Sequence, residues 1–111
     1  MPVIDKATFQ DLKQMSGADF INELIDAFLE DSPSMINQMQ VALATRDVES
    51  FRRSAHSLKS NANTFGAIEL AGLAKELEFM AKENNLEIGN KLEVLQEAFG
   101  KAAEELKELR T

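Results

Sequence analysis

Residues 51–78 read FRRSAHSLKSNANTFGAIELAGLAKELE, and the spacing of apolar residues in and just before this stretch decides the fold. Apolar residues recur there at intervals of three and four, the period of one face of an α-helix. This face consists of Val48, Phe51, Ala55, Leu58, Ala62 and Phe65. Such a seam packs against other helices at a shallow crossing angle, and its alanines predict the close approach of a neighbouring helix.

The second half of the stretch predicts another helix. Its inward positions are Leu70, Leu73, Ala74, Leu77 and either Met80 or Ala81. Between the two helices, Thr64-Phe65-Gly66 forms the turn, because glycine adopts the positive φ that costs other residues energy. We therefore expect helices over residues 47–63 and 67–82.

Upstream, the same period predicts a short helix within residues 1–16 and a long helix from Ala18. Phe9 and Leu12 form the apolar face of the short helix, which ends at Ser16-Gly17. The apolar stripe of the long helix is Phe20, Ile21, Leu24, Ile25, Phe28 and Leu29. Because proline is tolerated in a first helical turn, Pro33 marks either a new helix or a kinked continuation.

The last helix is predicted over residues 88–109, with Gly100 inside it at a cost of ~1 kcal/mol relative to alanine. Close packing is one explanation for that glycine. The connections are short, so consecutive helices are expected to be antiparallel neighbours. We predict an all-α fold: an up-and-down antiparallel four-helix bundle with a short N-terminal accessory helix, forming one domain over residues 1–111.

The composition excludes several classes of protein. A net charge of −7 argues against nucleic-acid binding, which requires clustered basic residues. The absence of cysteine removes disulfides, thiolate zinc sites and cysteine nucleophiles. No apolar run approaches the ~20 residues of a membrane span, and no signal peptide is visible. We expect a cytoplasmic protein that binds neither nucleic acid nor membrane.

The only histidine, His56, is rotated about 100° from the seam residue Ala55. Four residues three or four positions away share its face, and a fifth lies two turns on. They are Arg52, Arg53, Lys59, Ser60 and, two turns on, Asn63. Glu78 follows the seam residue Leu77 on the next helix, so its carboxylate could reach the imidazole.

The residues around this histidine argue against several kinds of chemistry. A metal site needs several converging histidines or carboxylates, so neither a metal nor another cofactor is expected. Ser57 and Ser60 lack the strained turn and oxyanion hole of a serine hydrolase. General acid–base catalysis lacks a substrate pocket. A phosphoryl carrier needs an exposed ring nitrogen, a nearby cation and an acceptor for the other nitrogen, and these residues supply all three. On spacing alone, an ordinary surface histidine remains the commoner explanation.

The segment AHSLKSNANTFGAIELAGLAKELE, residues 55–78, strongly resembles the signature of histidine-containing phosphotransfer (HPt) domains of two-component phosphorelays. The matching positions are His56, Leu58, Lys59, Phe65-Gly66-Ala67, Leu70, Leu73 and Leu77-Glu78. The resemblance covers residues 17–82 well and the last helix only by periodicity. It departs at Ser60, where many members have glycine, and at Asn61 and Asn63, which are slightly larger or more polar than usual.

The resemblance implies that His56 accepts a phosphoryl group on the ring nitrogen farther from the backbone. It further implies that Lys59 helps to hold this group and that Glu78 binds the other ring nitrogen. The face around His56 is expected to dock partners, with apolar help from the first two helices through residues such as Phe9 or Met15. The other predicted docking residues are Arg52, Arg53, Ser60, Asn63 and Gly66.

The implied function is that of a monomeric phosphocarrier without kinase activity of its own. It would relay a phosphoryl group between aspartates of receiver domains, with response regulators, hybrid histidine kinases or both as partners. Magnesium would belong to the receiver. One alternative is a helical interaction module without phosphoryl transfer. Another, less favoured, is the dimerising histidine domain of a sensor kinase, because Ser57 rather than an acidic residue follows His56.

Overall fold

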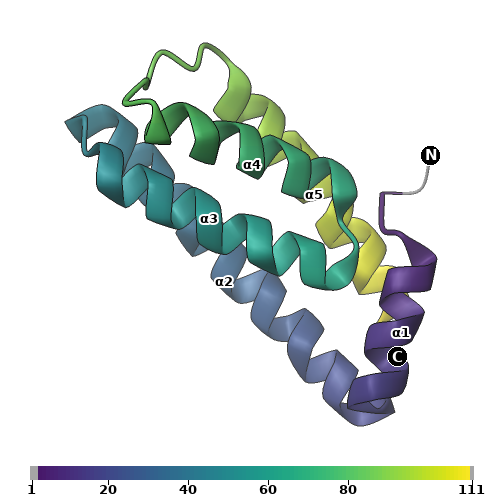
Figure 1. Ribbon diagram of the computed structural model, residues 1–111. Helices are drawn as coiled ribbons and strands as arrows, with labels where there is room; N and C mark the ends of the chain where they lie inside the picture. Colours follow the sequence, from purple (N-terminus) through teal and green to yellow (C-terminus); the bar gives the residue numbers. More distant parts are fainter. Residues whose placement is uncertain (1–2, 111) are drawn as a thin grey trace.

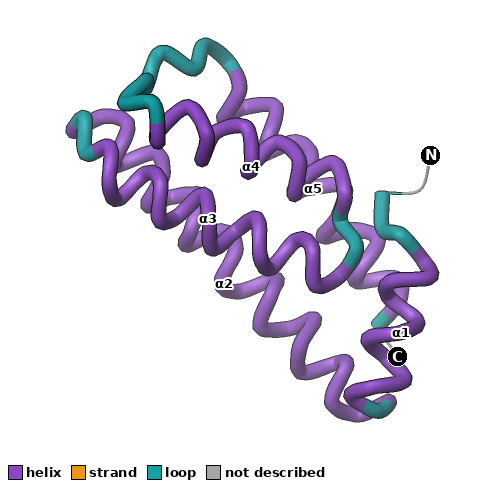
Figure 2. Tube along the Cα trace, viewed as in Figure 1, coloured by secondary structure: helices purple, strands orange, loops and turns teal. Residues whose placement is uncertain are grey.

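The computed structural model describes residues 3–110, which form five helices and no strand (Figures 1 and 2). The helices are α1 (Lys6–Ser16), α2 (Ala18–Thr45), α3 (Val48–Phe65), α4 (Ile68–Lys82) and α5 (Lys91–Leu109). Helices α2 to α5 form an antiparallel bundle, and the short α1 lies across one end of it (Figure 1). The predicted fold class is therefore confirmed. Within residues 3–110, none of the helices combines the length and apolarity that a membrane span requires.

The seam of α3 lies at the centre of the bundle. Phe51, Ala55, Leu58 and Ala62 are completely buried, as the spacing predicted. The small alanine side chains let α4 approach closely, and α3 makes its most extensive contacts with α4 and then with α2. Because these buried residues hold α3 against α4 and α2, only the opposite face of the helix is exposed to solvent.

Helix α2 runs without a break through Pro33, so the alternative of a separate helix starting there is wrong. Proline has no backbone N–H and cannot bond to the carbonyl of Leu29, which weakens the helix locally. The buried residues of α2 nevertheless share one face on both sides of the proline: Ile21, Ile25, Phe28, Ser32, Ile36, Met39 and Ala42. Packing of this continuous face outweighs the local cost.

The turn between α3 and α4 is anchored by the N-terminal segment. Gly66 has φ +77°, as predicted for this turn, and its carbonyl accepts a 2.8 Å hydrogen bond from the backbone N–H of Asp5. The neighbouring Ile4 is fully buried, although the sequence offered no periodic signal for it. The N-terminal segment thus completes the core at this end of the bundle.

Two aromatic residues differ from the sequence expectation. Phe9, named as an exposed docking residue, is only 3% exposed because α1 packs this side chain into the core. Phe20, placed in the apolar stripe of α2, is 51% exposed because it lies one residue before the buried Ile21 and so faces away from the bundle. Met15 is exposed, as expected.

The last helix also differs in two respects. It begins at Lys91 rather than at residue 88, because Gly89 has φ +60°, which a right-handed helix does not accommodate. Ile88 is still buried, but as part of the preceding loop. At Gly100, a Cβ atom would meet nothing within 4 Å, so close packing does not explain this glycine.

Candidate functional site

His56 is presented from the middle of α3. The helix starts at Val48 after a well-formed cap, in which the Asp47 carboxylate accepts the backbone N–H of Ser50 at 3.1 Å. Ala55 and Leu58, on either side of His56, are fully buried and hold this part of α3 against the core. The imidazole is turned away from them, and the His56 side chain is 56% exposed.

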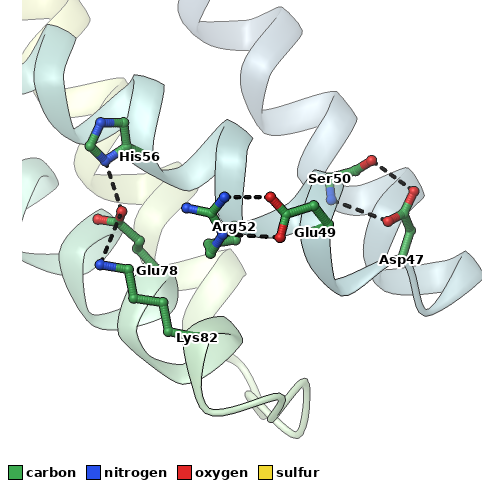
Figure 3. A network of polar contacts seen from close by, with 7 residues as sticks. All are labelled: Asp47, Glu49, Ser50, Arg52, His56, Glu78 and Lys82. Carbon is green, nitrogen blue, oxygen red and sulfur yellow. Dashed lines mark hydrogen bonds and ion pairs between the residues drawn. The ribbon is translucent and has the colours of Figure 1, made fainter.

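Glu78 on α4 holds one edge of that imidazole. Its Oε2 lies 2.7 Å from Nδ1 of His56, and the Glu78 side chain is only 4% exposed. The contact between Glu78 and the His56 imidazole that the sequence predicted is therefore present in the structure. Figure 3 shows the second ring nitrogen, Nε2, on the edge of the ring that faces away from the carboxylate.

The Glu78 carboxylate also binds two lysines. Lys59, on α3 and one turn from His56, donates to Oε1 at 2.6 Å, and its side chain is 24% exposed. Lys82 lies 3.9 Å from Oε2, the same oxygen that contacts His56 (Figure 3). Lys82 was not predicted from the sequence, although its position four residues after Glu78 places the two side chains on one helix face.

These contacts determine the charge of Glu78. Burial raises the pKa of this carboxyl group, but hydrogen bonds from Lys59 and His56 outweigh burial and leave the pKa below its usual value of 4.5. Glu78 is therefore an acceptor-only carboxylate at neutral pH. Since it lies within hydrogen-bond distance of Nδ1, the proton of the neutral imidazole is on Nδ1 and the free lone pair is on Nε2.

The predicted docking residues do not all lie on the open surface. Arg53, Ser60 and Asn63 are exposed on the same side of α3 as His56. Arg52 is half-buried and turns back to bind Glu49 through two hydrogen bonds (Figure 3).

Gly66 is buried beneath the N-terminal segment. A Cβ built on it would lie 2.9 Å from Cβ of Thr8 and 3.0 Å from the carbonyl oxygen of Asp5. We therefore leave Gly66 out of the docking surface, because its surroundings account for it as a turn residue covered by the chain itself.

His56 stands on an open surface rather than in a pocket. Grooves of about 590 and 420 Å³ are present in the described part of the chain, and neither is lined by His56. The larger one lies between α2 and α3 and includes Arg53 and Ser57 in its wall. An exposed ring nitrogen outside a pocket suits contact with a macromolecular partner that supplies the rest of a site.

Comparison with known proteins identifies the family. The Hpt domain family matches residues 23–111. The chain is 28% identical to the phosphorelay protein LuxU of Vibrio harveyi, over 77% of this chain and 75% of LuxU. It is 27% identical to the sensor protein TorS of Escherichia coli (strain K12), over 68% of this chain but only 8% of TorS.

A solved structure agrees over nearly the whole length. The crystal structure of histidine-containing phosphotransfer protein B (HptB) from Pseudomonas aeruginosa PAO1 has a TM-score of 0.89 and 28% sequence identity. The match covers 98% of this chain and 95% of that protein. With the family match over most of its length and the His56–Glu78 pair at its centre, the chain belongs to the Hpt domain family.

Proposed function

We propose that this protein relays a phosphoryl group between aspartates of receiver domains and carries it on Nε2 of His56. The observation that carries this proposal is the Nδ1–Glu78 contact of 2.7 Å. It holds the proton on one nitrogen and leaves the lone pair of the other nitrogen on an exposed edge of the ring. Membership of the Hpt domain family and the likeness to the phosphorelay protein LuxU and to HptB support the same function.

The transfer conserves atoms and charge. The Nε2 lone pair of His56 attacks the phosphorus of an aspartyl phosphate, a nitrogen–phosphorus bond forms, and the phosphorus–oxygen bond breaks with its electron pair left on the aspartate carboxylate. Positive charge develops on the imidazole as this occurs. The Glu78 carboxylate, which accepts the Nδ1 proton in a hydrogen bond, stabilises that charge. The reverse sequence passes the phosphoryl group to another receiver.

Lys59 supplies the cation that a transferring phosphoryl group requires. Its ammonium group shares the Glu78 carboxylate with His56, so it is already held beside the ring. The side chain is partly exposed, and the flexible four-carbon stem of a lysine allows its ammonium to turn towards a group on Nε2. We assign His56 as the nucleophile, Lys59 as the phosphoryl-binding cation and Glu78 as the positioning residue.

The partners we propose are receiver domains of response regulators or of hybrid histidine kinases. The chain spans three-quarters of LuxU but only 8% of the sensor protein TorS, so the likeness to TorS extends to one segment of that protein.

We propose that the chain acts as a monomeric phosphocarrier without kinase activity. Its sequence has no glycine-rich phosphate loop and no kinase signature. Magnesium would be held by the receiver.

Docking would use the open face of α3 around His56 together with apolar side chains at the end of the bundle where α1 meets α2. Arg53, Ser60 and Asn63 surround the imidazole on α3. Met15 is 85% exposed and Phe20 is half-exposed. Met15 and Phe20 lie five residues apart on either side of the Gly17 turn, and exposed apolar side chains that gather at one place, unlike single ones, support a protein-binding role for this end.

Substitution of His56 tests the proposal directly. The wild-type protein, incubated with a phosphorylated receiver, should gain acid-labile, alkali-stable phosphate, and His56→Gln should gain none while keeping its helical circular dichroism. Because the chain has one histidine, phosphohistidine can arise at one position only. Ser57→Ala, an exposed neighbour, is the matched control and should be phosphorylated normally. Alkali-stable phosphate on His56→Gln would refute the assignment, and its absence from the wild type would favour an interaction module.

A further inference from the structure

Glu78 is a buried carboxylate whose partners come from two helices. His56 and Lys59 reach it from α3, and Lys82 reaches it from α4. A third nearby cation besides the two lysines, Arg52, is bound to Glu49 and contributes only at longer range. The side chain of Lys82 is more than half exposed and lies at a looser 3.9 Å, compared with 2.6 Å for Lys59. Lys82 is therefore the cation that has room to move closer to the Glu78 carboxylate.

Phosphorylation creates a conflict for Lys59. In the unmodified protein its ammonium neutralises Glu78, but a phosphoryl group on Nε2 brings two negative charges to the other edge of the same ring. Both anions require the same ammonium group. Removing one partner from a buried ion pair leaves an uncompensated charge and is strongly unfavourable. Glu78 thus requires a replacement cation at the moment when Lys59 moves towards phosphate.

We propose that Lys82 is this replacement: as Lys59 turns to the phosphoryl group on His56, Lys82 closes onto Glu78 and keeps the carboxylate charged and bound to Nδ1. The inference rests on the proposed phosphotransfer function and adds a positioning residue to it. Lys82 acts through Glu78 and not on the phosphorus. The position of its ammonium beside Oε2, the oxygen that contacts His56, is the feature that supports this role.

The test uses phosphoramidate, a small donor that needs no docking surface and loses ammonia as its nitrogen–phosphorus bond breaks and the bond to Nε2 forms. Lys82→Gln should slow phosphorylation of His56 about two- to fivefold, the size expected for a partly exposed ion pair. Lys82→Arg should restore the rate because it restores the cation. Lys75→Gln is the matched control: Lys75 is exposed on the same helix, its loss changes net charge equally, and within the described residues no ion pair joins it to Glu78.

The same substitution made in a Lys59→Gln variant distinguishes this handover of Glu78 from Lys59 to Lys82 from direct binding of the phosphoryl group by Lys82. In Lys59→Gln, Lys82 is the lysine that remains on Glu78 both before and after phosphorylation, so adding Lys82→Gln should change the phosphorylation rate little further. If Lys82 instead bound the phosphoryl group, the two substitutions would slow the reaction independently. The ¹⁵N signals of the single imidazole supply another readout: in unphosphorylated Lys82→Gln they should match the wild type, because Lys59 still holds Glu78.

Three results would overturn the inference. Equal rates for Lys82→Gln and Lys75→Gln would show that only net charge matters. An undiminished effect of Lys82→Gln in the Lys59→Gln background would assign Lys82 to the phosphoryl group itself. A wild-type protein that takes no phosphate on His56 would overturn the proposed function and the handover with it, and that result is recognisable because every variant would behave alike.

Discussion

Nδ1 of His56 and Oε2 of Glu78 lie 2.7 Å apart, yet the imidazole is largely exposed and the carboxylate is buried. The pair is therefore a contact between an exposed side chain and a buried one. Burial excludes water from the carboxylate and strengthens its hold on the ring, while exposure keeps Nε2 within reach of a partner. The two residues come from α3 and α4, the helices with the most extensive mutual contacts, so their separation is set by the core beneath them.

Replacing Glu78 with glutamine should slow phosphorylation of His56 about tenfold, because a neutral acceptor makes a weaker hydrogen bond than a carboxylate. The amide keeps the size of the side chain and can still accept the Nδ1 proton. The rate with phosphoramidate measures the effect, and ring ¹⁵N shifts should show a larger share of the Nε2-protonated tautomer. A wild-type rate with an unchanged tautomer would remove Glu78 from the mechanism.

Glu78 should also make the stability of the fold depend on pH. Its pKa in the folded protein is lower than the usual 4.5. A carboxyl group with a lowered pKa stabilises the fold fully above its unfolded pKa, and this contribution is lost as pH falls through the folded pKa. Urea unfolding at pH 7 and at pH values below 4.5 should therefore show a smaller loss of stability in Glu78→Gln than in the wild type. Glu69→Gln, an exposed carboxylate on the same helix, is the control and should follow the wild-type pH dependence.

Gly66→Ala should lower the free energy of unfolding by about 1–3 kcal/mol, the cost of a positive φ in a residue with a Cβ atom. The new Cβ would also press on Thr8 and on the backbone of Asp5. Gly72→Ala in α4 is the matched control, since nothing lies within 4 Å of its Cβ position. That change should raise stability by about 1 kcal/mol. Equal effects of the two substitutions in urea titrations would contradict the role of the turn.

Ser32→Ala should stabilise the protein by about 1 kcal/mol, because the serine hydroxyl is buried without a partner among the described residues. Ser54→Ala provides the contrast. Its hydroxyl is also buried but donates to Gln38 at 3.2 Å, so this change should lower stability by about 1 kcal/mol. Thermal and urea unfolding of both variants would check the opposite signs. Destabilisation by Ser32→Ala would mean that the hydroxyl has a partner in solution.

The combined change of Met15→Ser and Phe20→Ser should slow transfer from a phosphorylated receiver about tenfold, the loss expected when apolar anchors leave an interface. The rate with phosphoramidate should stay at the wild-type value, because this donor makes no use of a docking surface. Ile68→Ser removes another exposed apolar side chain, from α4, and serves as the control. A reduced rate with both donors would point to damage at the His56 site and away from docking.

The sequence alone determined the helical fold and the place of His56 on it. The seam of α3 keeps one period from Phe51 to Phe65, and its buried positions agree with the structure because a helix face is a local, repeating property. The same geometry placed His56 off the seam, and the spacing of Leu77 and Glu78 placed a carboxylate on the facing helix. The likeness of residues 55–78 to the HPt signature rests on these same local positions.

Only the tertiary structure decided what these residues contact. Local rules allowed α2 to end at Pro33, but packing of one continuous face on the rest of the bundle carried it through. The stripe predicted for α2 placed Phe20 inside, yet the helix buries Ile21 and Ile25, and Phe20 faces away from the bundle and is exposed. The sharing of Glu78 among His56, Lys59 and Lys82 depends on the distance between α3 and α4, which the small side chains of the seam set and which no single helix encodes.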